Sequence, residues 1–344
     1  RYVIVDEMHQ WRGVSGSHIS LVLRRLLRIA RHLGADVQVI MMSATLADPQ
    51  SVAQTMIGRD NIDAITDDTS GRGTHHIFMW EGHEVPREED VSIDAFLSAL
   101  RAAEAGEETV LEAPTQRLSA QTEASLLCAE LIRANARLLT FVRSRGGAEA
   151  VAAQTRDKLR DAPELALTVA AYRGGFLPEE RRALESALRS GRLRALATTS
   201  ALEMGIDISG LDVTITAGWP GTRASFWQQV GRSGRAGADG ISVLIAGDNP
   251  LDSFLVHHSD EIFSPVEAAV LDPQNPWVLR DHLCAAAAEL PLPDDEAIAV
   301  FGSGAPALLA ELGQEGLLVN RSGGWRWNIS SSDGPWEKIQ IRGS

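Results

Sequence analysis

Two adjacent acids near the start of the chain are the residues that most directly suggest chemistry. Asp6 and Glu7 follow a short apolar run, Tyr2–Val5, and precede Met8 and His9. A carboxylate at the carboxyl end of a strand can hold Mg²⁺ on a nucleotide, usually through water. A neighbouring carboxylate can orient or deprotonate an attacking water. Asp6 is therefore the candidate magnesium residue and Glu7 the candidate catalytic residue. The alternative is a solvated acidic turn.

A small hydroxyl triplet, Ser43-Ala44-Thr45, follows one helix and one strand later. At the end of a strand beside Asp6, the hydroxyls of Ser43 and Thr45 can hydrogen-bond the acids and respond to the nucleotide. The alternative is that they cap the next helix, a role that Ser and Thr fill in many proteins.

Two arginines stand three residues apart in the octet Gln228–Arg235, and a glycine precedes each. Glycines allow the tight turns that point both guanidinium groups into one cleft. Planar and permanently charged, these groups suit a γ-phosphate in a loose transition state. Arg232 and Arg235 are the candidate arginine fingers, and Gln228 is a catalytic candidate with them. The alternative is a surface loop that carries arginines.

A strand end runs into a loop at Thr198–Asp207. The hydroxyls of Thr198 and Thr199 could bind a nucleic-acid phosphate without reading its sequence. Gly205 and Asp207 are the candidates that couple this contact to the nucleotide. The alternative is an ordinary loop whose hydroxyls only cap.

Basic and aromatic groups follow other predicted strands. Arg143, Ser144 and Arg173 could also contact nucleic acid, although solvated loops remain an equal alternative. Trp325 and Trp327 lie in a predicted hairpin, where an aromatic face could stack on a base. Packing of these rings onto neighbouring helices is the favoured alternative.

The elements that must position these residues suggest a parallel sheet at the start of the chain. The apolar runs at 2–5 and 37–42 predict buried strands, and 19–33 predicts a helix between them. On that helix, the spacing predicts that Arg24, Arg25, Arg28 and Arg31 point outward. Residues 1–73 are therefore expected to be part of an α/β domain, ending in a polar linker.

Residues 74–265 are expected to form a second, doubly wound α/β domain with an acidic insertion near 81–123. Within the insertion, 93–101 is a predicted helix. Strands and helices then alternate; strands are predicted at 138–142, 167–171, 193–198, 213–217 and 241–245, and helices at 126–133, 147–159, 178–190 and 225–230. Residues 266–344 are predicted to form a partial winged helix of α+β type, with helices at 277–289 and 305–312 and a hairpin over 317–328.

Composition excludes some classes of protein. No apolar run approaches the ~20 residues that a membrane span needs. The two cysteines, Cys128 and Cys284, indicate neither a disulfide framework nor a structural zinc site, and favour a reducing cytoplasm. The net charge of −14 argues against a nucleic-acid partner, but the acids cluster away from the arginines.

With these blocks in this order, the chain resembles the superfamily 2 helicases of DExH type, whose motor is two RecA-like domains that close on ATP. Motifs II to VI are matched in turn by Asp6–His9, Ser43–Thr45, Thr140–Arg145, Thr198–Asp207 and Gln228–Arg235. More narrowly, the chain is similar to the bacterial mitomycin-repair and large-helicase-related (Lhr-like) group in four further blocks: Trp11–His18, Ala171–Arg182, Ala217–Thr222 and Gly247–Asp252.

The resemblance implies ATP and Mg²⁺ as cofactors, and single-stranded or partly duplex DNA as the partner. It implies 3′-to-5′ movement in DNA repair, an accessory winged helix, and a location in the cytoplasm with the nucleoid. In such a motor His9 would form a contact bridging the two domains. An RNA helicase, or a nucleic-acid-binding scaffold without catalysis, are the alternatives.

Three departures from the family pattern stand out. Met8 replaces the usual Ala, which is tolerable if the position faces the core. No Gly-Lys-Thr or Gly-Lys-Ser phosphate loop occurs, and neither does the cysteine-rich metal region of repair-type members. We therefore expect a fragment of a longer protein, beginning at motif II, that does not hydrolyse ATP efficiently alone.

Overall fold

The computed structural model describes residues 1–67, 69, 71, 73–86, 115–203, 208, 211–234, 237–329 and 334–341. The chain divides into two compact units: unit 1 comprises Arg1–Asp68 and Val266–Ser344, and unit 2 comprises Thr69–Pro265. The division into three domains at 73/74 and 265/266 stays a prediction. Within the described ranges, no helix is both long and apolar enough to span a membrane.

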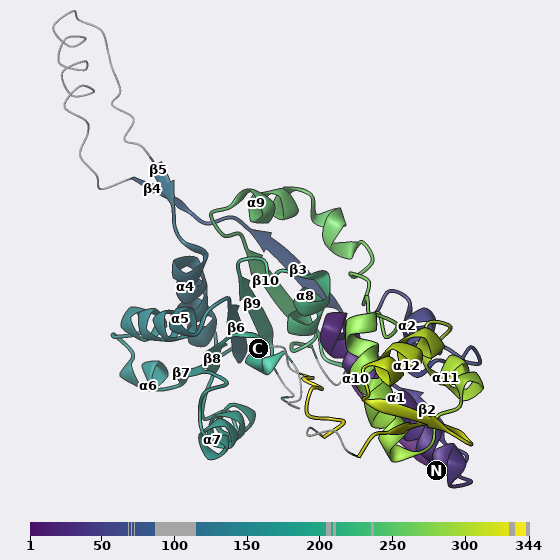
Figure 1. The fold of residues 1–344 in the computed structure, drawn as a ribbon. Coiled ribbons are helices and arrows are strands. Elements are labelled where there is room, and N and C mark those ends of the chain that lie inside the picture. The colour runs from purple at the N-terminus through teal and green to yellow at the C-terminus, as the bar shows by residue number, and fades with distance from the viewer. Residues whose placement is uncertain are drawn as a thin grey trace, which may run out of the picture. The chain divides into compact units, whose positions relative to one another are not determined.

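Unit 2 is organised around a six-stranded sheet in the order β3-β10-β9-β6-β8-β7, in which every neighbouring pair is parallel (Figure 1). The chain enters the sheet at the edge strand β3 and then forms β6. From β6 it crosses to the other edge at β7, returns to β8, and then adds β9 and β10 on the opposite side of β6. The order therefore reverses between β6 and β9. The strands are β3 (His75–Trp80), β6 (Leu138–Val142), β7 (Val169–Tyr172), β8 (Ala195–Thr198), β9 (Val213–Ala217) and β10 (Gly240–Ile245).

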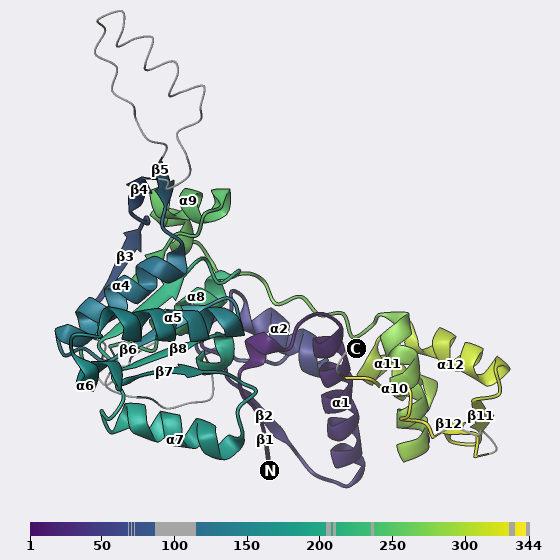
Figure 2. The same ribbon diagram turned by 90° about the vertical axis from the view of Figure 1, so that its left-hand side faces the viewer.

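Helices cover both faces of this sheet, because alternate side chains of each strand point to opposite faces. Leu138 and Val142 of β6 pack with α4 and α5, whereas Leu139 and Phe141 belong to the cluster that includes Leu188 of α7. Figures 1 and 2 show α4 and α5 on one side of the sheet, with α8 and α7 on the other. The helices are α4 (Ala120–Arg133), α5 (Arg145–Lys158), α6 (Pro163–Ala166), α7 (Pro178–Arg189), α8 (Arg223–Val230) and α9 (Pro250–His257).

Smaller elements complete unit 2. They are the antiparallel pair β4 (Glu84–Pro86) and β5 (Thr115–Arg117), and the 3₁₀ turns η2 (Ser200–Leu202) and η4 (Ser259–Phe263). β4 and β5 flank the predicted acidic insertion, and the helix predicted at 93–101 lies outside the described residues. The predicted doubly wound α/β class of this region is confirmed.

Unit 1 contains a parallel pair of strands, β1 (Tyr2–Val5) and β2 (Gln38–Met41), joined through the turn η1 (Met8–Gln10) and the long helix α1 (Gly13–His32). Helix α2 (Pro49–Ile57) follows β2 and packs on α1. The predicted strand–helix–strand order is confirmed, and β1 has the predicted bounds.

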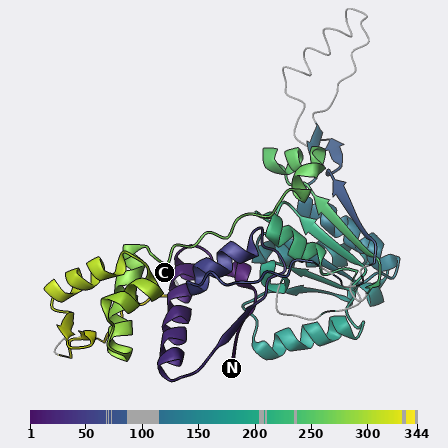
Figure 3. The ribbon, with the colours of Figure 1, turned by 90° about the vertical axis from the view of Figure 1, so that its right-hand side faces the viewer.

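The later segment of unit 1 consists of α10 (Pro276–Glu289), α11 (Asp294–Phe301), α12 (Ala305–Gln314) and the antiparallel hairpin β11 (Leu318–Arg321) with β12 (Gly324–Trp327). The helices and hairpin predicted for the winged-helix segment are present. Figure 3 shows the purple helix α1 beside these yellow-green elements. Leu21 of α1 is fully buried in the same hydrophobic cluster as Leu283, Phe301 and Leu309.

The predicted outward orientation of the α1 arginines is wrong for two of them. Arg24 and Arg28 are buried, at 7% and 1% exposure, and Arg25 is partly covered, whereas Arg31 is exposed as expected. Helical spacing identifies a polar face, but it cannot show that a segment about 260 residues later will cover that face.

Candidate nucleotide and nucleic-acid sites

In unit 1 the candidate nucleotide residues converge at the carboxyl ends of β1 and β2. The Nδ1 atom of His9 lies 3.1 Å from Oγ of Ser43, and 3.5 Å from a carboxylate oxygen of Glu7. The backbone helps to build this group, since the N–H of Met8 donates to the carbonyl of Met42 at 2.9 Å. Residues 34 positions apart in the sequence therefore meet at one strand edge.

Glu7 has a left-handed backbone, with φ 51° and ψ 47°, which is uncommon for a residue other than glycine. Its N–H donates to Oδ1 of the preceding Asp6 at 2.8 Å, so the two acids are joined locally. Asp6 is exposed and Glu7 is half-buried. Strained backbone of this kind is common at functional sites, where the surrounding structure holds it in place.

His9 sits in a partly buried position beside this carboxylate. Burial lowers the pKa of His9 below its ordinary value and outweighs the opposing effect of the Glu7 carboxylate, while Arg12 lowers it further. The ring is therefore mostly neutral at pH 7, and Nδ1, which makes both contacts, can carry the proton that is donated to the Glu7 carboxylate or to the Ser43 hydroxyl. This suits a polar link between Glu7 and Ser43.

The capping alternative for Ser43-Ala44-Thr45 is wrong. The next helix, α2, is capped by Asp48, whose side chain accepts from the N–H of Ser51 at 3.0 Å. Ser43 instead contacts His9, and Oγ1 of Thr45 is buried without a hydrogen-bond partner among the described residues. Met8 is 2% exposed and belongs to a hydrophobic cluster, as expected for a position that faces the core.

In unit 2 a cavity of about 240 Å³ opens where the strand order reverses, between the carboxyl ends of β6 and β9. Open α/β sheets place ligands at such switch points. Two predicted nucleic-acid residues, Arg143 and Thr199, line the cavity together with Ser200, Glu203 and Gln229. Thr198 is fully buried, and its hydroxyl donates to the carbonyl of Thr199 at 3.1 Å.

Two further candidates already have partners within unit 2. Ser144 caps α5, because its hydroxyl accepts from the N–H of Gly147 at 3.0 Å. Arg173 pairs with Glu149 at 2.8 Å and lies over the ring of Phe176, 4.8 Å from its centroid. Ser144 thus has the structural role of a cap whether or not it also binds nucleic acid.

Arg232 is buried at the carboxyl end of α8, and its guanidinium donates to the backbone carbonyl of Glu203. Gln228 lies on the same helix in a half-buried position. Arg235, Gly205 and Asp207 lie outside the described residues. The contact between Arg232 and Glu203 joins the segment predicted to bind the γ-phosphate, Gln228–Arg235, with the segment predicted to bind nucleic acid, Thr198–Asp207.

Comparison with known proteins identifies the group to which the chain is similar. Residues 122–237 match the helicase conserved C-terminal domain, and residues 271–344 match the winged helix domain of the ATP-dependent helicase HRQ1. The uncharacterized ATP-dependent helicase YprA of Bacillus subtilis (strain 168) is 32% identical over 99% of this chain and 42% of its own length. HRQ1 of Saccharomyces cerevisiae (strain ATCC 204508 / S288c) is 32% identical over 85% of this chain and 26% of its length.

A solved structure agrees. The crystal structure of the DUF1998 helicase MrfA bound to DNA matches 99% of this chain and 42% of that chain, at 31% identity and a TM-score of 0.83. A second MrfA crystal structure, with DNA and AMPPNP, matches with the same TM-score and identity and covers 44% of that chain. The chain belongs to the Lhr-like group of superfamily 2 DExH-type helicases. It spans less than half of the length of the curated relatives it matches.

The predicted fold class is confirmed by the family models and the solved structure. Part of a first RecA-like domain lies in unit 1, a second RecA-like domain forms unit 2, and a winged-helix segment follows. In that segment, the rings of Trp325 and Trp327 pack against the hydrophobic cluster of α10–α12. Trp325 Nε1 also donates to Asp294 at 2.8 Å. The predicted packing of these rings on the helices is observed, and base stacking by Trp325 stays a prediction.

Sequence reasoning missed two polar residues of the Lhr-like helicase fold that line the cavity. Glu203 is buried, and its Oε1 accepts from Ser225 at 2.8 Å and from Gln229 at 2.6 Å. Gln229 in turn accepts from the Thr216 hydroxyl at 2.8 Å. An acid in a strand-end loop was the available signal, but nothing local showed that it would be buried against α8.

Proposed function

We propose that this chain carries part of the motor of an ATP-dependent DNA helicase or translocase that moves 3′ to 5′ and acts in DNA repair. The observation that carries this proposal is the meeting of Glu7, His9 and Ser43 at the ends of two parallel strands. A solvated acidic turn has no need for a strained backbone, a neutral histidine and a hydroxyl in one group. The similarity to ATP-dependent helicases over 99% of the chain supports the same function.

In this proposal Glu7 orients and deprotonates the water that attacks the γ-phosphate of ATP. His9 and Ser43 hold the Glu7 side chain and sense the nucleotide, and Asp207 and Gly205 couple it to the nucleic acid. Arg232 and Arg235 stabilise the charge on the γ-phosphate when the two RecA-like parts close. Gln228 assists them from helix α8, which ends at Val230, just before Arg232.

Asp6 fits the magnesium ion that this chemistry needs. It is an exposed carboxylate beside Glu7, and carboxylate oxygens are the ligands that Mg²⁺ prefers, often through retained waters. When bound, the ion would neutralise charge on the β- and γ-phosphate oxygens. Among the described residues, no group of three or more His, Cys, Asp or Glu side chains is arranged to hold a metal directly, which suits a site completed by water and nucleotide.

The cavity at the β6/β9 switch point supports a nucleic-acid track. Arg143 and Thr199 present a guanidinium and a hydroxyl there, groups that bind phosphates without reading sequence. Ser144 and Arg173 would lie along the same track, and Trp325 would contact a base. Thr198 is fully buried, so it would support the loop that carries Thr199 rather than contact the nucleic acid itself. MrfA is a helicase whose crystal structure holds DNA, which favours DNA over RNA for this chain.

Cys128 and Cys284 are both buried free thiols, in keeping with a reducing compartment. We place the protein in the cytoplasm, associated with the nucleoid, on these thiols and on the proposed DNA substrate.

The deciding experiment measures ATP turnover by the full-length protein, with single-stranded DNA, with RNA, and with no nucleic acid. We expect stimulation by DNA, and a loss of turnover of at least about 100-fold in Glu7→Gln because the water-activating carboxylate is removed. Glu311→Gln, the same change at an exposed helical position, is the matched control. The chain by itself should not turn over ATP efficiently.

Each other outcome selects an alternative. Stimulation by RNA but not DNA would indicate an RNA helicase. Binding of DNA without turnover in any form would indicate a scaffold. Persisting turnover in Glu7→Gln would show that another residue activates the water.

A further inference from the structure

Two arginines of α1 contact the winged-helix segment of unit 1. Leu21, Arg24 and Arg28 lie three or four residues apart, which places them on one face of the helix. All three are buried, and that face packs on α10 and α11. Two guanidinium groups are therefore enclosed between segments that are more than 230 residues apart in the sequence.

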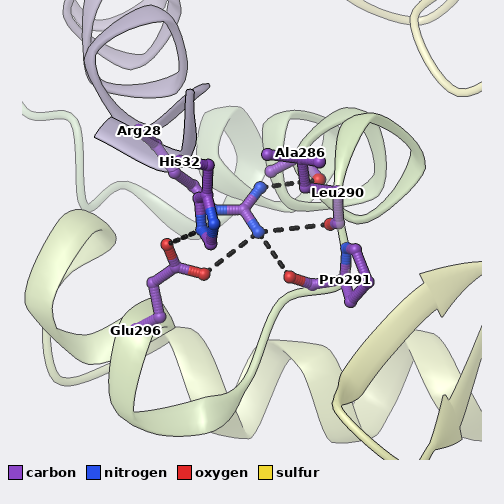
Figure 4. A network of polar contacts seen from close by, with 6 residues as sticks. All are labelled: Arg28, His32, Ala286, Leu290, Pro291 and Glu296. Atoms are coloured by element: carbon purple, nitrogen blue, oxygen red, sulfur yellow. Dashed lines mark hydrogen bonds and ion pairs between the residues drawn. The ribbon is translucent and has the colours of Figure 1, made fainter. Parts of the chain in front are cut away.

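Arg28 is the centre of this contact, with a side chain that has no exposed surface. Figure 4 shows its guanidinium among three backbone carbonyls at the end of α10. It donates to Ala286 at 2.9 Å, to Leu290 at 3.2 Å and to Pro291 at 2.5 Å. Its Nη2 also lies 3.1 Å from a carboxylate oxygen of Glu296 on α11.

Ala286 also accepts from the N–H of Leu290 at 3.2 Å, so Arg28 matters most for the carbonyls of Leu290 and Pro291, which follow the last residue of α10. The last carbonyls of a helix have no partner within the helix, and a cation there also interacts favourably with the helix dipole. Arg28 thus satisfies the end of α10 from outside and joins it to α11. Because a guanidinium is planar and rigid, this set of acceptors fixes one orientation of the two helices relative to α1.

Arg24, one turn earlier on α1, makes a second buried contact with the winged-helix segment; we call the contacts of Arg24 and Arg28 together the joint. Its guanidinium donates to the carbonyl of Thr55 in α2, and to that of Val300 in α11 at 3.0 Å. Burial lowers the pKa of Arg24 to about 10, so the group stays charged at neutral pH. Gly58 lies beneath it, since a β-carbon there would come within 3.0 Å of the guanidinium carbon.

Two partly exposed contacts flank the joint. Arg25 makes a two-pronged contact with Glu289, and His32 lies 2.7 Å from Glu296. Exposed ion pairs add little stability, so the buried guanidinium groups decide the geometry. Removing Arg28 would leave the buried carbonyls of Leu290 and Pro291 without this donor and Glu296 without its buried cation, which is costly.

We propose that Arg28 and Arg24 are positioning residues that make the winged-helix segment a fixed extension of the first RecA-like part. This inference rests on the proposed function. In a motor that closes and opens around ATP, a segment held this way moves with the part that carries Glu7. Force on the nucleic acid then passes through the joint, so strand separation depends on the joint while ATP turnover does not.

The experiment compares two rates in the full-length protein, duplex unwinding and ATP turnover stimulated by single-stranded DNA. Arg28→Met keeps the length and apolar stem of the side chain but removes its donors. We expect DNA-stimulated turnover within about twofold of wild type and unwinding slower by about tenfold or more, a typical size for energetic coupling between sites. Arg31→Met, on the exposed side of the same helix, should change neither rate.

A cross-link separates loss of position from loss of structure. In the Arg28→Met protein, His32→Cys and Glu296→Cys are joined by a short bismaleimide; the two cysteines of this chain, Cys128 and Cys284, are buried. Restored unwinding would support the joint. Equal unwinding by wild type and Arg28→Met, or a parallel fall of both rates that the cross-link does not reverse, would overturn it. If wild type shows no DNA-stimulated turnover, the proposed function fails instead.

Discussion

The two parallel sheets of the molecule bury their strands to different extents. In unit 2 every residue of β6, β8 and β9 is buried, as expected for a parallel sheet with helices on both faces. In unit 1 the burial of β1 and β2 alternates, and Tyr2 and Ile4 are 68% and 62% exposed. Similar apolar runs thus have different surroundings.

The difference reflects how much of each RecA-like domain this chain contains, since unit 1 holds only part of the first one. Unit 2 buries its sheet between helices that are close in sequence. Unit 1 relies on α1, which packs its apolar residues and two arginines against helices from the far end of the chain. The comparison therefore predicts that the two units respond differently to the same kind of change.

The largest expected effect is that of deleting residues 266–344. Leu21, Arg24 and Arg28 would lose their cover, so we expect α1 to lose its protection against hydrogen exchange while α5 in unit 2 keeps its own. Mass spectrometry of amide exchange measures both helices in one sample. Undiminished protection of α1 would show that the early segment of unit 1 is stable by itself.

A smaller effect separates equivalent strand positions in the two sheets. Leu138→Ala in β6 removes a fully buried side chain and should lower the free energy of unfolding of unit 2 by about 3 kcal/mol. In this chain by itself, Ile4→Ala in β1 should change stability by less than about 0.5 kcal/mol, because the side chain is mostly exposed. Denaturant unfolding measures both, and comparable losses would contradict the contrast between the sheets.

The smallest effect concerns Ser144, the cap of α5. Ser144→Ala should destabilise unit 2 by about 1 kcal/mol, whereas Ser144→Asp should retain the cap. If Ser144 also lies on the nucleic-acid track, Ser144→Asp should weaken DNA binding through charge repulsion although the protein stays stable. Unchanged DNA affinity in Ser144→Asp would leave Ser144 with the capping role only.

Much of the fold could be predicted from the sequence, because buried strands are continuous apolar runs. The bounds of β1, β6 and β9 agree with prediction, as does the alternation with helices. Helix α1 begins six residues before its predicted start, since glycines at 13 and 16 weaken the helical pattern. Helices α2, α6, α9 and α11 were not predicted; the first turn of α11 appeared only as a cluster of acids.

The candidate site was predictable as far as strand ends determine it. Asp6, Glu7 and Ser43 follow neighbouring parallel strands, which must finish at one edge. The partners of Arg28 and the burial of Glu203 were not predictable, because they depend on side chains brought together by tertiary packing. A charged residue has the same local pattern whether water or a carbonyl satisfies it.

His18 of α1 and His282 of α10 are both buried, and their ring centroids lie 5.2 Å apart. His282 Nδ1 lies 3.2 Å from the guanidinium of Arg25, which can only donate, so that nitrogen must accept. The proton of His282 therefore lies on Nε2 and is donated to Nδ1 of His18, 2.9 Å away. Nδ1 of His18 is then the acceptor, and the proton of the neutral His18 ring lies on its Nε2. Burial, Arg25 and His18 lower the pKa of His282 to about 3. Below pH 6.5 His282 becomes protonated in the unfolded chain, whereas the folded protein keeps it neutral. Acid therefore lowers the free energy of unfolding and weakens the contact between α10 and α1. The nitrogen resonances of these two imidazoles would report whether the helices are still in contact.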